Sequence, residues 1–230
     1  IVAEPAKVLI PGTKDKGLWK PVMAEDIALM NPSTAKVFEE IQDETGMSVY
    51  ELLNDKVNIY GKLYKQNFSL GRWLVLSNAG GSNPCAAYID LEKYDTSRLI
   101  IDQTLYWYMA SSEEEALFIT GMINSTALND AIKDFQPDGG FGKRHIHKLP
   151  YKVIPRYDSE NSAHELVVEK TKMLIDRWID YCKSDEKGAY IAPNSGTLNC
   201  RRKKLQAALK ELPEYINYEC ACNSVLGLEN

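Results

Sequence analysis

The first thirty residues show no regular alternation of hydrophobic and polar positions. Three prolines and two glycines interrupt them, so we expect extended and looped chain there. A helical pattern then opens at Ser33, after Pro32, and runs toward Leu53. Gly46 divides this pattern, because a glycine inside a helix weakens it relative to alanine.

From Trp73 onward the pattern changes to that of β-strands. Residues 73–76 form a β-branched and aromatic run that ends at the turn signal Asn-Ala-Gly-Gly of residues 78–81. Segments 86–89 and 98–109 predict two further strands, the second with a roughly alternating apolar face. A short strand bounded by prolines is predicted at 151–155. These segments predict a small mixed sheet.

Helical patterns flank these strands and dominate the C-terminal third. Ser112 with Glu115 and Ser162 with Glu165 form two capping-box patterns, which predict helices that begin there. Helices are also predicted over residues 126–135, over 201–212, where Pro213 ends the pattern, and over 215–225. The fold class is therefore α+β, with a small mixed sheet flanked by helices and a C-terminal helical layer. We expect an α+β domain over 1–158 and a helical region over 159–230 that packs on it.

Composition narrows the class of protein. The chain has 230 residues, of which 44% are hydrophobic and 26% charged, a balance that excludes a disordered chain, a collagen-like fibre or a disulfide-stapled module. No apolar run approaches the roughly 20 residues of a membrane helix. The 5 cysteines are odd in number and irregularly spaced, which favours reduced thiols and a cytoplasmic location.

The net charge of −5 argues against a protein that coats nucleic acid through bulk positive charge. It leaves room for a local basic face. The chain begins with Ile1 and lacks a secretory leader pattern, so we expect it to be part of a longer protein whose remaining motifs lie upstream.

Catalytic motifs are absent from the sequence. It contains no phosphate-binding loop, dinucleotide fingerprint, zinc-protease helix or nucleophile elbow. Methylation of a base amino group needs an Asn-Pro-Pro-aromatic turn to hold the base. The pairs Asn31-Pro32 and Asn83-Pro84 continue instead with Ser33 and Cys85. Whether the chain has catalytic activity of its own stays open.

The glycine-rich segment after residue 138 is the most informative one. Residues 139–156 carry five Lys or Arg and two His, and no acid. Freed backbone N–H groups and these side chains are suited to phosphate oxygens. The candidate DNA contacts are Gly140, Gly142, Lys143, Arg144, His145, His147 and Lys148. The alternative is that the glycines make a tight crossing and the basic side chains are merely solvated.

Two further groups of residues suit nucleic acid. Arg201 and Arg202 begin a second basic cluster, a candidate phosphate clamp, although a solvated helix face is the more common meaning of such a run. Six aromatic side chains are candidates to stack on bases. They are Tyr60, Tyr64, Trp73, Tyr106, Trp107 and Tyr108, of which we expect Trp73 and Trp107 to serve the core.

Metal binding is not predicted. His145 and His147 have only His164 as a further histidine, and no acid lies at ligand spacing. Cys220 and Cys222 are better explained as small buried hydrophobic side chains.

The order of several motifs resembles a known family, and the resemblance covers about residues 30–182. In sequence, these are Trp73-Leu74-Val75-Leu76-Ser77, Ile101-Asp102-Gln103-Thr104-Leu105-Tyr106-Trp107, Glu114-Glu115-Ala116-Leu117, Ile123-Asn124-Ser125, the run Phe135-Gln136-Pro137-x-Gly139-x-Phe141-Gly142-x-Arg144-x-Ile146-His147-Lys148, and Val153-Ile154-Pro155-Arg156-Tyr157-Asp158. This order is similar to the C-terminal target-recognition region of adenine-N6 DNA methyltransferases of restriction–modification systems, especially the type IIG kind.

The resemblance implies a module that reads the sequence of double-stranded DNA. An upstream domain of the same polypeptide would bind S-adenosylmethionine and transfer the methyl group, so no cofactor is expected in this chain. Asn124, Ser125 and the Ile154-Pro155 pair would be scaffold. The turn at Gly142–Arg144 would open the recognition surface, or Arg144 would brace the loop.

The leading hypothesis is therefore a DNA sequence-recognition domain. The alternative, from another class, is a protein–protein interaction module that docks a partner through Trp178, Met173 and Leu205. It predicts exposed apolar patches on the C-terminal helices and no continuous positive face. A small-molecule enzyme that uses Asp102, His145 and His147 has no supporting spacing.

Overall fold

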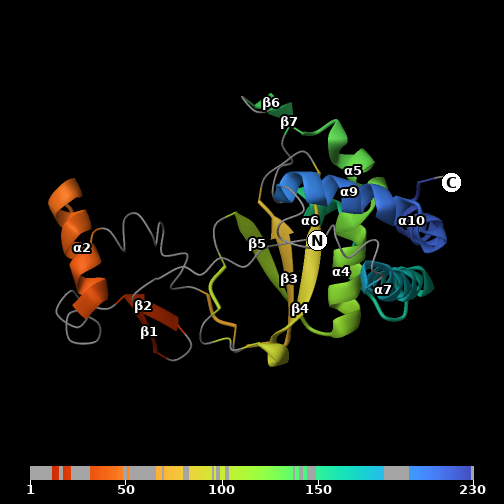
Figure 1. Ribbon diagram of the computed structural model, residues 1–230. Coiled ribbons are helices and arrows are strands. Elements are labelled where there is room, and N and C mark those ends of the chain that lie inside the picture. Colours follow the sequence, from red (N-terminus) through yellow and green to blue (C-terminus); the bar gives the residue numbers. More distant parts are fainter. Residues whose placement is uncertain are drawn as a thin grey trace. The chain divides into compact units, whose positions relative to one another are not determined.

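A computed structural model of the chain describes residues 12–15, 18–21, 32–48, 51, 66–68, 70–79, 83–94, 96, 99–101, 104–136, 138–139, 142–143, 149–183 and 197–228 (Figure 1). The chain divides into two compact units. The first contains Gly71–Asp90 and Thr104–Asn230 together with Ile1–Pro5, and the second contains Ala6–Leu70 and Leu91–Gln103.

A three-stranded antiparallel sheet forms one layer of the first unit. Strand β3 (Trp73–Asn78) lies between β4 (Ala86–Asp90) and β5 (Leu105–Ala110), and Trp73 pairs with both Asp90 and Ala110. Leu74 and Val75 point to opposite faces and are both fully buried. The alternation of strand side chains therefore supplies two apolar faces.

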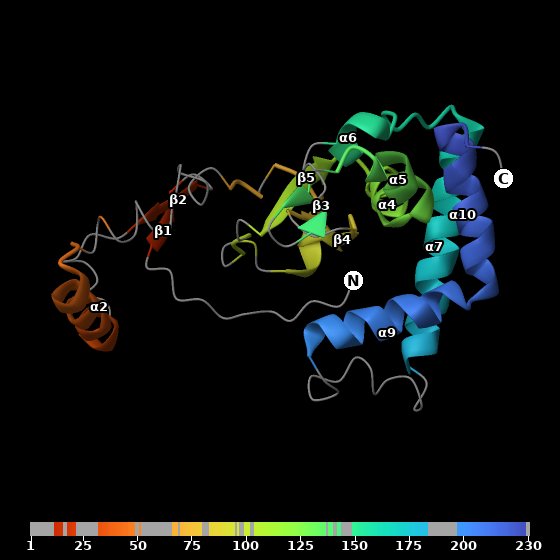
Figure 2. The same ribbon diagram turned by 90° about the horizontal axis from the view of Figure 1, so that it is seen from above.

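Helices cover one face of this sheet (Figures 1 and 2). Helix α4 (Glu113–Asn124) packs on β3 and β4, and α5 (Thr126–Lys133) follows it directly. Ser112 Oγ accepts the backbone N–H of Glu115 at 3.1 Å, and Ser125 Oγ accepts that of Leu128 at 3.1 Å. Each hydroxyl satisfies one of the amides that the first turn of a helix leaves free.

Two long C-terminal helices complete the core. Helix α7 (Ser162–Lys183) lies beside α10 (Pro213–Leu226), and α7 packs on α4 while α10 packs on α5. Figure 2 shows α9 (Leu198–Lys210) extending away from this pair. The shared core joins sheet and helices through fully or nearly fully buried side chains, among them Val75, Phe118, Met122, Leu128, Val167 and Cys222.

Small and hydroxylic side chains let α4 approach its neighbours closely. A Cβ on Gly121 would lie only 2.2 Å from Thr171 Oγ1 of α7. The buried Tyr218 hydroxyl of α10 donates a hydrogen bond to the Gly121 carbonyl oxygen. Glu219 of α10 accepts the Thr126 N–H at 2.9 Å and so caps α5 from a distant part of the chain. These contacts fix α10 against the α4–α5 junction.

The second unit contains the hairpin of β1 (Gly12–Asp15) and β2 (Leu18–Pro21), and helix α2 (Pro32–Thr45). The helix ends at Gly46, whose φ of 67° lies in the left-handed region that glycine adopts without strain. The prediction that Gly46 interrupts the helical pattern is thus confirmed.

The α+β fold class is confirmed, with three corrections to its details. The sheet is purely antiparallel, and the strand predicted at 151–155 is wrong, because Leu149–Val153 forms a short helix, α6. Pro150 is compatible with a first helical turn, and the Ile154 N–H donates to the Pro150 carbonyl at 3.0 Å.

The second correction concerns the strand predicted over 98–109, which begins only at Leu105. Upstream, the side-chain amide of Gln66 bonds both backbone groups of Ile101, at 2.6 and 2.8 Å, and replaces a strand partner there. The third concerns α7. Its first turn is capped by Asn161, whose Oδ1 accepts the Ala163 N–H at 3.0 Å, and Glu165 bonds Tyr157 instead of completing the predicted capping box.

Among the helices in the described part of the chain, none combines the length and the hydrophobicity of a membrane-spanning segment.

Candidate functional site

A small hairpin marks the glycine-rich segment that the sequence singled out. Strands β6 (Asp138–Gly139) and β7 (Gly142–Lys143) pair antiparallel, with Gly139 opposite Gly142, so two residues connect them. Such a tight connection favours glycines because it requires unusual backbone angles. Figure 1 shows the hairpin standing beyond α5 at one end of the first unit. The segment therefore projects from the core.

Few of the predicted contact residues fall within the described part of the chain. Gly142 and Lys143 lie in the backbone of β7. Arg201 and Arg202 lie in α9, where the description covers their backbone only. The remaining predicted contacts, which are Gly140, Arg144, His145, His147 and Lys148, lie outside the described residues.

The structure fixes both flanks of this hairpin firmly. On one side Gln136 is buried at the end of α5. On the other side the Tyr151 hydroxyl of α6 lies 2.8 Å from Ser77 Oγ of β3, and burial raises the pKa of Tyr151. Ile154 is buried as well. The predicted scaffold role of the Ile154-Pro155 pair agrees with this burial.

Exposed cations follow the hairpin. Lys152 of α6 and Arg156 are both exposed. Arg156 lies near Tyr108 of β5, and its positive charge acts to lower the pKa of the Tyr108 phenol. The described end of the basic segment therefore presents positive charge beside an aromatic edge strand.

Tyr108 is held at this edge by a hydrogen-bond network. Its hydroxyl donates to Glu115 Oε1 at 2.7 Å, and burial together with Glu115 raises the pKa of Tyr108 to about 12. Burial opposes the ionisation of Glu115, but hydrogen bonds from Ser111 and Tyr108 outweigh it and lower the pKa of Glu115. At neutral pH the pair is a neutral phenol and a carboxylate.

The aromatic candidates divide into buried and exposed members. Trp73 packs against the core, with its ring centroid 6.1 Å from that of Tyr88, so its predicted structural role is confirmed. Trp107 is 37% exposed and Tyr108 39%, so the prediction that Trp107 belongs to the core is wrong. β4 and β5 are both edge strands, but α4 packs mainly on β3 and β4, so β5 is the more exposed of the two edges. Tyr60 and Tyr64 lie outside the described residues.

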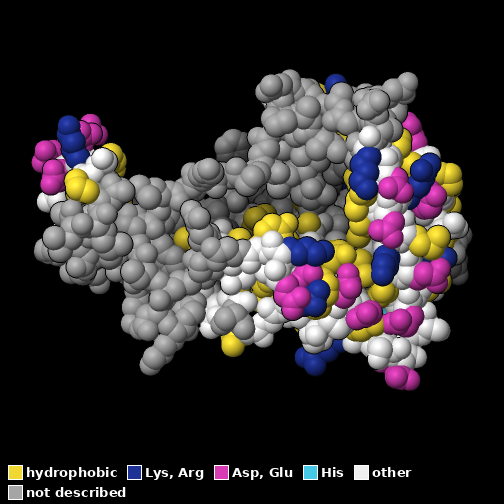
Figure 3. All heavy atoms as spheres, turned by 60° about the horizontal axis from the view of Figure 1, so that its bottom comes forward, with side chains coloured by type: hydrophobic (Ala, Val, Ile, Leu, Met, Phe, Trp, Pro, Cys, Tyr) yellow, Lys and Arg dark blue, Asp and Glu magenta, His cyan; other side chains and the backbone are white. Residues whose placement is uncertain are grey.

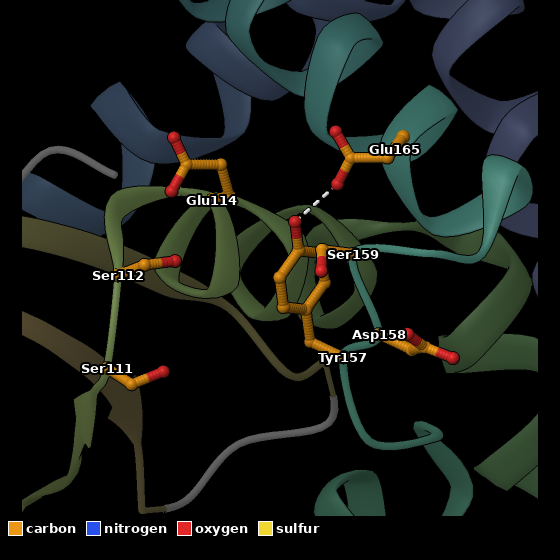
Figure 4. A pocket seen from close by; sticks show the side chains of 7 residues that line it. All are labelled: Ser111, Ser112, Glu114, Tyr157, Asp158, Ser159 and Glu165. Carbon is orange, nitrogen blue, oxygen red and sulfur yellow. Dashed lines mark hydrogen bonds between the residues drawn. The ribbon is translucent and has the colours of Figure 1, made fainter.

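A polar hollow of about 510 Å³ is a feature that the sequence did not reveal (Figure 4). It lies where α4 and α7 begin and is lined by hydroxyl and carboxylate side chains. They are Ser111, Ser112, Glu114, Tyr157, Asp158, Ser159 and Glu165. Its three carboxylates repel phosphate, so this hollow does not suit a nucleic-acid backbone.

Buried aromatic contacts support the wall of this hollow. Tyr157 donates a hydrogen bond to Glu165, and burial and that carboxylate raise the pKa of Tyr157. The ring of the buried His164 packs at a tilt against Phe118, with the ring centroids 4.6 Å apart, and its Nδ1 accepts the Asp158 N–H at 3.1 Å. His164 thus has a structural role. Within the described residues no group of three or more His, Cys, Asp or Glu side chains is placed to hold a metal ion.

The residues of the alternative docking hypothesis do not form one exposed patch. Leu205 is buried, and Trp178 packs against the core and stacks on Tyr181 at 5.3 Å. Only Met173, at 48%, is exposed. Figure 3 shows Lys and Arg side chains interspersed with Asp and Glu over the described part of one face.

Comparison with known proteins adds a likeness of fold. No family model matches the chain, and no curated protein matches it significantly. Among solved structures, the type IIL restriction–modification enzyme MmeI, determined in complex with DNA, is similar with a TM-score of 0.51 and 14% sequence identity. The match covers 90% of this chain and 25% of the enzyme's chain. This chain therefore shares its fold with a part of that enzyme and spans about a quarter of its length.

Proposed function

We propose that this chain is the DNA target-recognition part of a site-specific adenine-N6 DNA methyltransferase of a restriction–modification system. The observation that carries the proposal is the likeness of fold, over 90% of the chain, to a restriction–modification enzyme solved with DNA. The order of motifs in the sequence points independently to the same class of enzyme.

The projecting hairpin and the basic segment after it are the recognition surface in this proposal. Gly139 and Gly142 flank the connection between the two strands, and Lys143 follows Gly142 in β7. The exposed Lys152 and Arg156 lie at the described end of the basic segment. Cationic side chains of this kind bind phosphates and set the register of the DNA, while side chains that enter the major groove read the bases. The firm attachment of α5 and α6 gives the hairpin a defined base.

Methyl transfer belongs to an upstream domain in this account. That domain would bind S-adenosylmethionine and act on an adenine flipped out of the duplex. The chain itself would position the DNA. This division agrees with a sequence that has no catalytic motif.

Substitution of Arg144 tests the proposed surface. We expect Arg144→Ala in the 230-residue chain to weaken binding to duplex DNA and to reduce the salt dependence of log K by about one phosphate contact, because one cation is lost. The melting temperature should stay unchanged. Fluorescence anisotropy at several salt concentrations and a thermal melt measure the two effects.

Lys172→Ala provides the matched control, because Lys172 is an exposed cation on α7, away from the hairpin. It should leave DNA affinity unchanged. A large fall in melting temperature with unchanged DNA affinity for Arg144→Ala would assign Arg144 a bracing role and contradict its place in the recognition surface.

A further inference from the structure

Helix α9 differs from the other helices of its unit in its charges. Its 13 residues carry five cations, Arg201, Arg202, Lys203, Lys204 and Lys210, and no acid. Helices α4 and α7 carry Glu residues in their first turns, where the helix dipole favours negative charge. In α9 the first turn has no acid, and the dipole favours only Lys210, which lies in the last turn. The dipole therefore does not account for the four cations nearer the start of the helix.

The fold gives this helix one buried side and one exposed side. Leu205 is buried, and Leu209 packs against the core. The exposed side carries Lys203, Gln206, Ala207 and Lys210. Lys203 and Lys210 are two turns apart, so they lie on the same side, about 10 Å apart along the helix axis. Within Leu198–Lys210 the exposed side is positive and carries no carboxylate, and the first carboxylate after it is that of the exposed C-cap residue Glu211.

We propose that the exposed side of α9 binds the phosphate backbone of duplex DNA, as a second contact separate from the hairpin. This inference rests on the proposed function. Charge complementarity carries it. Over about 10 Å of axis, one DNA strand presents about three phosphates, a spacing that two lysines two turns apart can follow. The small Ala207 and the uncharged Gln206 between them leave the backbone room to approach.

Such a contact adds affinity without reading bases. It is anchored through the buried side of α9, so the lysines are presented from a helix and not from a loop. In a protein with a net charge of −5, positive charge gathered on two surfaces favours DNA binding there and leaves little non-specific attraction elsewhere.

A charge-neutralising double variant tests the inference in the 230-residue chain. Lys203→Gln combined with Lys210→Gln should make the plot of log K against log salt less steep by about 1.8, because two phosphate contacts are lost. The loss of affinity should be similar for duplexes of different sequence. Because both side chains are exposed, the melting temperature should not change.

The matched control is Lys172→Gln combined with Lys183→Gln. Both lysines are exposed on α7, and Lys183 Nζ lies 3.8 Å from Asp180 Oδ1. This variant has the same change of net charge and should keep the wild-type slope. Equal reductions in both variants would attribute the effect to net charge and overturn the role of α9.

The remaining outcomes separate the two proposals. A wild-type chain that binds duplex DNA, with an unchanged slope in the α9 double variant, would overturn the inference and leave the proposed function standing. A wild-type chain without salt-dependent affinity would overturn the proposed function. Tighter binding of poly-glutamate than of duplex DNA at equal charge concentration, weakened in the α9 variant, would show a face for acidic polypeptides and contradict the commitment to DNA.

Discussion

Helices α9 and α10 follow one another in the chain and have opposite physical roles. Helix α10 buries Tyr218, Ala221 and Cys222 and caps α5 through Glu219. Helix α9 presents lysines to solvent. The helical layer is therefore not uniform, because α10 helps to fix the base of the hairpin whereas α9 presents positive charge.

The anchoring of α9 gives the largest expected effect. Leu205→Ala should remove about 3 kcal/mol of stability from α9, because it deletes a buried leucine and leaves a cavity. Amide hydrogen exchange should accelerate in α9, while the amides of α4 remain protected. The neighbouring exposed Gln206→Ala should change stability by less than about 0.5 kcal/mol. Equal loss of protection in α4 would show that α9 belongs to the core and break the comparison.

The close approach of α4 and α7 gives the next effect. Gly121→Ala should lower the free energy of unfolding by about 2 kcal/mol, because the new methyl group would overlap Thr171 Oγ1. Among the described residues, this hydroxyl has no hydrogen-bond partner, so its removal costs little.

A double-mutant cycle measured by chemical denaturation checks this packing. In a Thr171→Ala background the penalty of Gly121→Ala should shrink to a fraction of its value. An equal penalty in both backgrounds would contradict the overlap as its cause.

Thiol labelling perturbs the protein least and compares the exposure of cysteine side chains on α9 and α10. Burial raises the pKa of Cys222 on α10 to about 12, so its thiol stays protonated and shielded at neutral pH. Cys200 on α9 is exposed, and so is Cys220 on α10, so the prediction that Cys220 is buried is wrong and only Cys222 reports on the packing of α10. A short alkylation followed by peptide mapping should modify Cys200 and spare Cys222 until denaturant is added. Rapid modification of both thiols in the native protein would mean that α10 is not packed as described.

Local signals predicted much of the fold. The Ser112–Glu115 pattern placed the start of α4, because capping depends on residues three positions apart. The helix at 149–153 was missed, because β-branched residues before a proline indicate a strand, whereas the contact of Tyr151 with Ser77, 74 positions away, is invisible in the sequence.

The candidate site was predicted less completely. The glycines marked the segment as a place where the chain turns tightly, but the hairpin that β6 and β7 form there was not predicted. The exposure of Trp107 depends on the order of the strands and on which of them α4 covers, and neither is a local property of the sequence. The hollow between α4 and α7 likewise arises from two helix starts that the fold brings together.

The central claim is that this chain binds duplex DNA through positively charged surfaces. Titration of a labelled mixed-sequence duplex with the 230-residue chain, at several salt concentrations, tests it most directly. The account predicts measurable affinity whose logarithm falls linearly with the logarithm of the salt concentration. No binding at low salt, or an affinity that salt does not change, would contradict it.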